Sequence, residues 1–78
     1  MKAGSSETYE RFCQLLTEAR KKSGLSQQEV ADQLGRPQTY VSRCESGARR
    51  MDVVEFLEMA DVIGLDPLAL IKKLRSGG

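Results

Sequence analysis

The chain has 78 residues, with 12 Lys and Arg against 11 Asp and Glu, so its formal net charge is +1. A chain this short folds as one domain near the lower limit for a self-sufficient core, which leaves little room for an enzyme cleft. With no histidine and only two cysteines, a conventional zinc site is excluded. We therefore expect a single binding domain over residues 1–78, without metal or cofactor.

The first helix is expected over about residues 6–22. Periodicity is helical throughout the chain, and no alternating Val- or Ile-rich run indicates a strand. Three basic residues at 20–22 precede Gly24, which suits the negative C-terminal end of a helix. The inner positions of this helix are Tyr9, Phe12, Leu15, Leu16 and Ala19.

The second helix is expected to begin at Ser26. Ser26 and Glu29 have the spacing of a capping box, in which each side chain bonds the backbone amide of the other residue. Gly35 ends the helix, with a positive φ. The inner positions are Val30, Ala31 and Leu34.

The third helix is expected over about residues 37–46, because Pro37 presets the backbone angle of a first helical position. A proline also pushes the preceding residue, Arg36, out of helical conformation, so the turn between the second and third helices is sharp. Gly47 ends the third helix, and its inner residues are Val41 and Cys44.

Two more helices are expected after residue 51. The first, over about residues 52–63, carries a wide apolar arc of Val53, Phe56, Leu57, Met59, Ala60 and Ile63 beside an acidic stripe of Glu55, Glu58 and Asp61. The second begins with Asp66 as N-cap and Pro67 at the first helical position, and its inner residues are Leu70, Ile71 and Leu74. The folded core thus covers about residues 7–75, followed by a short disordered tail.

The apolar segments of the sequence indicate the cellular location of the protein and the surroundings of its two cysteines. The longest apolar runs are only a few residues and the N-terminus is polar, so we expect a cytoplasmic protein with no membrane partner. Cys13 and Cys44 fall in apolar helical runs and are expected to be reduced core thiols. A redox-sensing pair is the alternative.

Residues 26–47 combine two short helices with a tight glycine turn, which is typical of a helix-turn-helix. Ala31 is small enough for close helix packing, and Val41 fills the angle between the helices. The segments 24–31, 34–35 and 41–47 resemble, in order and spacing, the phage-repressor and Cro type of helix-turn-helix domain, the XRE family. The resemblance covers about residues 10–74.

That resemblance implies an all-α, compact five-helix bundle of the lambda-repressor-like type, whose third helix enters the major groove of double-stranded DNA. It also implies a homodimer on a partly palindromic operator and a partly buried ion pair between Arg20 and Glu45. Two unrelated surface charges are the alternative for that pair. Pro37 and Cys44 depart from the Ser or Thr and the Ile or Leu that are common in the family, which affects local stability and not the fold.

Base contacts are expected from the third helix, because side chains at the start of a recognition helix reach deepest into the groove. Gln pairs with adenine, Arg pairs with guanine, and the Thr methyl packs on the thymine methyl. The expected base contacts are Gln38, Thr39, Ser42 and Arg43. A merely solvated helix face is the alternative, but no acid lies between Arg36 and Glu45.

Charge separates along the chain and predicts a basic face. Residues 36–50 carry four arginines and one glutamate, whereas residues 52–66 carry five acids and no base. Free amides at the start of the second helix also favour an anion. The expected phosphate contacts are Gln27, Gln28, Arg36, Tyr40, Arg49 and Arg50. For Tyr40, packing at the edge of the core is an equal alternative, and the acidic stripe of residues 55–61 is expected to face away from DNA.

A subunit interface is expected from apolar residues outside the main inner arcs of the last two helices, together with one residue inside them. They are Val54, Met59, Val62 and Leu68. A monomer with scattered exposed apolar residues is the alternative.

The sequence therefore predicts a sequence-specific DNA-binding regulator of transcription that is not an enzyme. Restriction-modification controllers, phage repressors and antitoxins are small members of this family, and the sequence does not separate them. The alternative is a protein-interaction or scaffold module that kept the fold, which the lack of acids at positions 38, 39 and 43 disfavours. No nucleophile and base pair, phosphate loop or small-molecule ligand is indicated.

Overall fold

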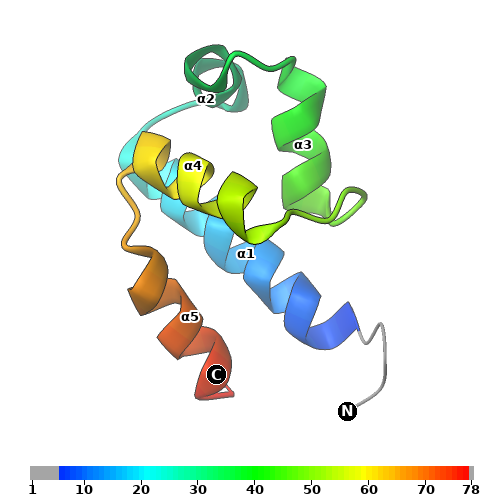
Figure 1. Ribbon diagram of the computed structural model, residues 1–78, viewed down its shortest axis with the longest axis vertical. Coiled ribbons are helices and arrows are strands. Elements are labelled where there is room, and N and C mark those ends of the chain that lie inside the picture. The colour runs from blue at the N-terminus through cyan, green and yellow to red at the C-terminus, as the bar shows by residue number, and fades with distance from the viewer. Residues whose placement is uncertain (1–5, 78) are drawn as a thin grey trace.

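The computed structural model describes residues 6–77. Within that range the chain forms five α-helices and no strand, as expected (Figure 1). The helices are α1 (Ser6–Ser23), α2 (Gln27–Leu34), α3 (Gln38–Ser46), α4 (Val53–Ile63) and α5 (Pro67–Arg75). None of these helices is long and apolar enough to cross a membrane.

The start of α2 and its end at Gly35 are built as the sequence indicates. Ser26 Oγ accepts from the Glu29 amide at 3.0 Å, and Glu29 Oε1 accepts from the Ser26 amide at 2.8 Å, which completes the capping box. Gly35 ends α2 at φ 69°, in the left-handed region that favours glycine. Pro37 is the N-cap and not the first helical residue, so α3 begins at Gln38.

The core is centred on α1, which packs against α3, α4 and α5, while α2 packs most closely against α3. Its largest fully buried side chains are Leu16, Val30, Val41, Cys44 and Met59. Figure 1 places α2 and α3 together at one end of the molecule and α5 toward the other. The helix pair of the expected recognition motif is therefore a distinct end of the bundle.

Ile71 on α5 is exposed, so its expected inner position is wrong. Most of the apolar arc of α4 is buried, as Phe56, Met59, Ala60 and Ile63, whereas Val53 and Leu57 are exposed. The reason is that α4 covers its neighbours mainly with Phe56 and the fully buried side chains near its C-terminus, which leaves its N-terminal apolar residues uncovered.

Hydrogen bonding continues past Arg75, the last residue of α5. Ser76 Oγ donates to the Lys73 carbonyl at 3.0 Å, and the Gly77 amide donates to the Leu74 carbonyl at 3.3 Å. Gly78, the last residue of the expected tail, lies outside the described residues.

Candidate nucleic-acid interface

Helix α3 divides cleanly into an inner and an outer side. Tyr40, Val41 and Cys44 are buried, whereas the four side chains expected to contact bases all retain exposure. Thr39 and Arg43 are exposed, and Gln38 and Ser42 are half-buried. The structure therefore brings all four onto the side of α3 that the core leaves uncovered.

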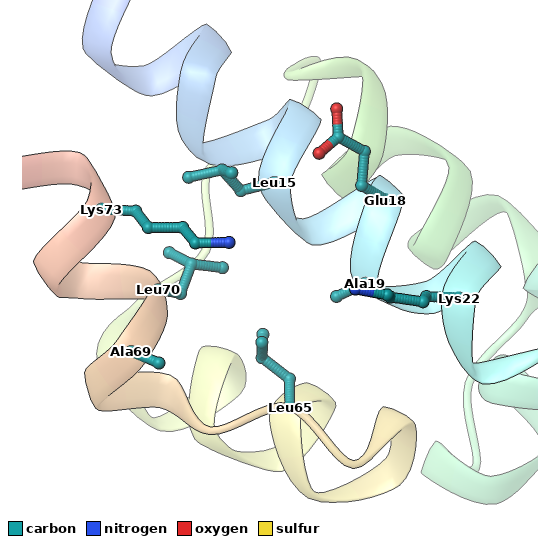
Figure 2. A pocket seen from close by; sticks show the side chains of 8 residues that line it. All are labelled: Leu15, Glu18, Ala19, Lys22, Leu65, Ala69, Leu70 and Lys73. Carbon is teal, nitrogen blue, oxygen red and sulfur yellow. The ribbon is translucent and has the colours of Figure 1, made fainter. Parts of the chain in front are cut away.

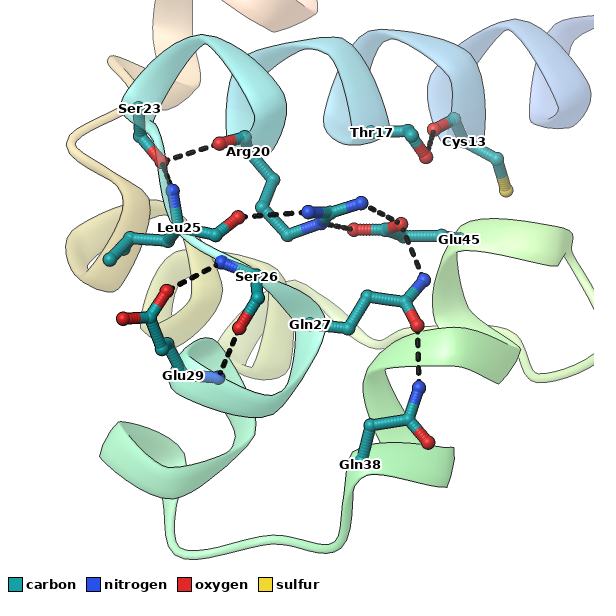
Figure 3. A network of polar contacts seen from close by, with 10 residues as sticks. All are labelled: Cys13, Thr17, Arg20, Ser23, Leu25, Ser26, Gln27, Glu29, Gln38 and Glu45. Carbon is teal, nitrogen blue, oxygen red and sulfur yellow. Dashed lines mark hydrogen bonds and ion pairs between the residues drawn. The ribbon is translucent and has the colours of Figure 1, made fainter.

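A chain of polar contacts runs from α1 to the first residue of α3 (Figure 3). Arg20 Nε lies 2.6 Å from Glu45 Oε2 and Arg20 Nη2 lies 3.1 Å from Glu45 Oε1, which is the ion pair that the resemblance implies. Glu45 Oε1 also accepts from Gln27 Nε2 at 2.9 Å, and Gln27 Oε1 accepts from Gln38 Nε2 at 2.5 Å. Helices α1, α2 and α3 are thus joined through side chains as well as through the core.

This network sets how the Gln38 amide can meet a base. Each Nε2 carries two hydrogens, and the bond to Gln27 uses only one of them. The other hydrogen and Gln38 Oε1 together form the donor and acceptor pair that matches N7 and N6 of adenine. One Gln38 N–H and Gln38 Oε1 therefore remain free of the bond to Gln27, which holds the amide in place.

The two glutamines at the start of α2 have different surroundings. Gln27 is half-buried and bonded to Glu45 and Gln38, with one amide hydrogen left to donate. Gln28 is exposed, and its Nε2 donates to Asp32 Oδ1 at 2.8 Å. Both lie beside the N-terminus of α2, where unpaired backbone amides favour an anion.

Tyr40 lies on the inner side of α3, and two arginine guanidinium groups lie against its ring. Its side chain is packed with the core at 8% exposure, which is the alternative to a phosphate contact. The Arg36 guanidinium lies 4.4 Å from the ring centroid and that of Arg49 lies 5.0 Å from it. Burial raises the pKa of Tyr40 to about 12, so its hydroxyl stays protonated at neutral pH.

Glu55, one residue of the acidic stripe that is expected to face away from DNA, lies beside this basic cluster. Its carboxylate accepts from Arg49 Nη1 and Nη2, each at 3.0 Å, and lies 3.9 Å from Arg36 Nη2. The physical reason is a second capping box, in which Glu55 Oε1 accepts from the Asp52 amide at 3.1 Å and so turns back past the start of α4. The D-x-x-E spacing at residues 52–55 is the sequence signal that could have found this.

The loop after α3 is tied to α1 through Tyr9, which sequence reasoning placed only in the core. The Tyr9 hydroxyl donates to the Arg49 carbonyl at 3.3 Å and accepts from the Met51 amide at 3.1 Å. The Arg50 guanidinium lies 4.4 Å from the centroid of the same ring. Residues 49–51 are therefore held in place, and Arg50 remains exposed.

The four residues expected at a subunit interface do not share one environment. Val54 and Leu68 are 63% and 70% exposed. Val62 is partly buried against the core, and Met59 is 0% exposed. Met59 fills the interior of its own chain and cannot touch a second one, so its place among the interface residues is wrong.

Neither cysteine is placed for reactivity. Cys13 and Cys44 are free and buried, and burial raises the pKa of both thiols, which disfavours the reactive thiolate. Among the described residues no group of three or more potential metal ligands comes together.

A hollow of about 380 Å³ lies between α1 and α5 (Figure 2). It is lined by leucines and alanines together with Glu18, Lys22 and Lys73. None of its lining residues belongs to α2 or α3. It is therefore separate from the surface that carries Gln38 and Arg43.

Comparisons with known proteins agree with this arrangement. Residues 11–71 match a family model described as a helix-turn-helix domain. The solved structure of an XRE-family like protein from Pseudomonas syringae pv. tomato str. DC3000 is similar to this chain, with a TM-score of 0.84 and 46% sequence identity. The match covers 88% of this chain and 84% of that one. No curated protein matches the chain.

Proposed function

Because the chain belongs to the XRE-type helix-turn-helix family of DNA-binding regulators, we propose that it binds a partly palindromic operator as a homodimer and so controls transcription. Helix α3 lies in the major groove, with Gln38, Thr39, Ser42 and Arg43 against base edges. The bond from Gln38 to Gln27 is the observation that carries this proposal, because it fixes a base-reading amide at the tip of α3.

Phosphate contacts flank the helix on both sides. The backbone amides at the start of α2 and the remaining hydrogen of Gln27 Nε2 bind one phosphate. This contact positions the neighbouring Gln38 along the DNA. On the other side, Arg36, Arg49 and Arg50 meet the backbone from the turn and from the loop after α3. Tyr40 supports the first two as a platform, and its hydroxyl is not required to touch DNA.

The homodimer is supported by exposed apolar side chains on α4 and α5. Val54 and Leu68 belong to a set of large apolar residues that the chain leaves exposed, which also includes Val53, Leu57 and Ile71. A second copy of the chain would remove part of this surface from water. Two copies would also place two α3 helices on successive major grooves, which a palindromic operator requires.

Selection of bound sequences from a random duplex pool tests the proposal, because it returns both base preference and half-site spacing. We expect two inverted half-sites about one helical turn apart. On the selected duplex, Gln38→Ala and Arg43→Ala should each weaken binding by about 1 to 3 kcal/mol. Lys72→Ala removes an exposed charge from α5 and is the matched control, with little effect expected.

The opposite outcome points to the other function class. Protein that binds no duplex even at low salt would act as a protein-interaction module and not as a regulator that occupies DNA. Equally tight binding to all sequences would show that the protein binds DNA but recognises no specific operator.

A further inference from the structure

Glu55 is the one residue of α4 that the structure places within ion-pair distance of the arginines beside α3. Resting on the proposed DNA binding, we propose that Glu55 determines specificity. It positions Arg36 and Arg49 for one operator phosphate, and it lowers the affinity of the protein for DNA whose phosphates do not lie at that position.

The contacts of Glu55 fix the Arg49 guanidinium and hold that of Arg36 nearby. Arg49 approaches with both terminal nitrogens at 3.0 Å, the two-pronged geometry that fixes orientation as well as distance. Arg36 Nη2 lies 3.9 Å from the same carboxylate and is held loosely. Because both groups also lie on the Tyr40 ring, neither can swing away without losing two interactions.

The Glu55 side chain is less exposed than the side chains of the two arginines that it contacts. The Glu55 side chain is 14% exposed, whereas the side chains of Arg36 and Arg49 are each 39% exposed. A phosphate that approaches the cluster therefore meets the arginines first, with the carboxylate behind them. The arginines keep exposed N–H donors for that phosphate, since Glu55 uses only part of their hydrogen-bonding capacity.

The charges of the cluster explain how it discriminates. Two arginines and one glutamate leave one net positive charge, so a phosphate that merely lies nearby is attracted less than it would be by two free arginines. A phosphate in register gains direct, oriented bonds to both guanidinium groups. Glu55 thus lowers binding to unrelated DNA while it preserves binding to the operator.

The substitution Glu55→Gln isolates this effect from the fold. Glutamine serves the same position of a capping box as glutamate, so the start of α4 keeps its bond to the Asp52 amide. The change removes only the negative charge and the paired acceptor that hold Arg49. Glu58→Gln is the matched control, because it makes the same change in net charge at an exposed site one turn further along α4.

The test measures affinity for the selected operator and for an unrelated duplex over a salt series. For Glu55→Gln we expect about two- to fivefold tighter binding to the unrelated duplex, because the loss of one surface charge changes a binding affinity by about this factor. Its salt slope should steepen by up to about 0.9. Operator binding should be unchanged or weaker, so the ratio of the two affinities falls. Glu58→Gln should leave that ratio unchanged.

Two results would overturn the proposal in different ways. If the wild-type protein binds DNA and Glu55→Gln leaves the affinity ratio at the wild-type value, the role of Glu55 is refuted and the proposed function stands. If the wild-type protein binds neither duplex, the proposed function fails and this inference fails with it. Circular dichroism of each variant confirms that the fold is intact before binding is compared.

Discussion

The side chain of Gln38 is held by Gln27: Gln38 Nε2 lies 2.5 Å from Gln27 Oε1. The first residue of α3 is thereby bonded to the first residue of α2 across the turn of the motif. Gln27 is in turn bonded to Glu45, which forms the ion pair with Arg20. The Gln38 amide, which we propose to contact a base, is therefore the outer end of a network anchored in α1.

Gln27→Ala should weaken operator binding by about 1 to 3 kcal/mol and relax the preference at the base that we propose Gln38 to contact. The reason is that the Gln38 amide loses the bond that orients it. Fluorescence anisotropy on the selected operator, and on the operator with that base pair changed, measures both effects. Gln33→Ala is the control, since Gln33 is exposed on the same helix and is not an expected contact; equal effects of the two changes would contradict this role of Gln27.

Glu45→Ala should lower the free energy of unfolding by about 3 to 5 kcal/mol, because the buried guanidinium of Arg20 is left without its partner. Chemical denaturation followed by circular dichroism measures this loss. The double variant Arg20→Ala with Glu45→Ala should be destabilised by clearly less than the sum of the single changes. Strictly additive losses would show that the two residues do not stabilise each other.

Tyr40→Phe should leave operator affinity close to that of the wild-type protein, because the ring that supports Arg36 and Arg49 is retained. Tyr40→Ala should destabilise the fold by about 3 to 5 kcal/mol through loss of a buried ring. Operator titrations and denaturation curves of both variants test this. A large loss of affinity in Tyr40→Phe with normal stability would instead assign the hydroxyl to a phosphate.

Acid should weaken the fold through Glu55. Its pKa lies below the ordinary value of 4.5, first because the Asp52 amide donates to it and then because Arg49 does. The folded state therefore binds this proton less readily than the unfolded chain, so the stabilisation is complete above pH 4.5 and is lost as the pH falls through the lowered pKa. The thermal midpoint should fall over that range, and less steeply in Glu55→Gln. Identical pH profiles for the two proteins would contradict this assignment.

Leu68→Asp and Val54→Asp should each shift the protein from dimer to monomer, because a charge would enter the proposed apolar interface. Operator binding should weaken as the two half-sites cease to be bound together. Sedimentation equilibrium gives the oligomeric state directly. Gln14→Asp adds the same charge at an exposed site on α1 and should leave a dimer. A wild-type monomer that still binds the operator tightly would refute this interface.

The helices and the turn of the motif could be predicted from the sequence because their signals are local. Ser26 and Glu29 are three residues apart, and the bonds they form join neighbouring residues only. The same holds for Asp66, which accepts from the Leu68 amide at 3.0 Å. Pro37 was misplaced by one position because its fixed φ suits the N-cap as well as the first helical residue.

The surroundings of the basic face could not be predicted in full, because they depend on the path of the loop between α3 and α4. That path brings Arg49 to Glu55 and its carbonyl to Tyr9, contacts between residues 6 and 40 positions apart. The apolar arc of α4 was also ambiguous: the same periodicity covers Met59, which is buried, and Leu57, which is exposed. Only the packing of the other helices decides between them.

The network from Arg20 to Gln38 has a consequence for how this protein could acquire a new operator. A substitution at Gln38 that suits another base also leaves Gln27 Oε1 without its partner, and through Gln27 it reaches Glu45. Changes in recognition are therefore expected to be epistatic, with the best residue at position 38 depending on the residue at position 27. Libraries that vary both positions together should yield new specificities that stepwise mutation of α3 alone does not reach.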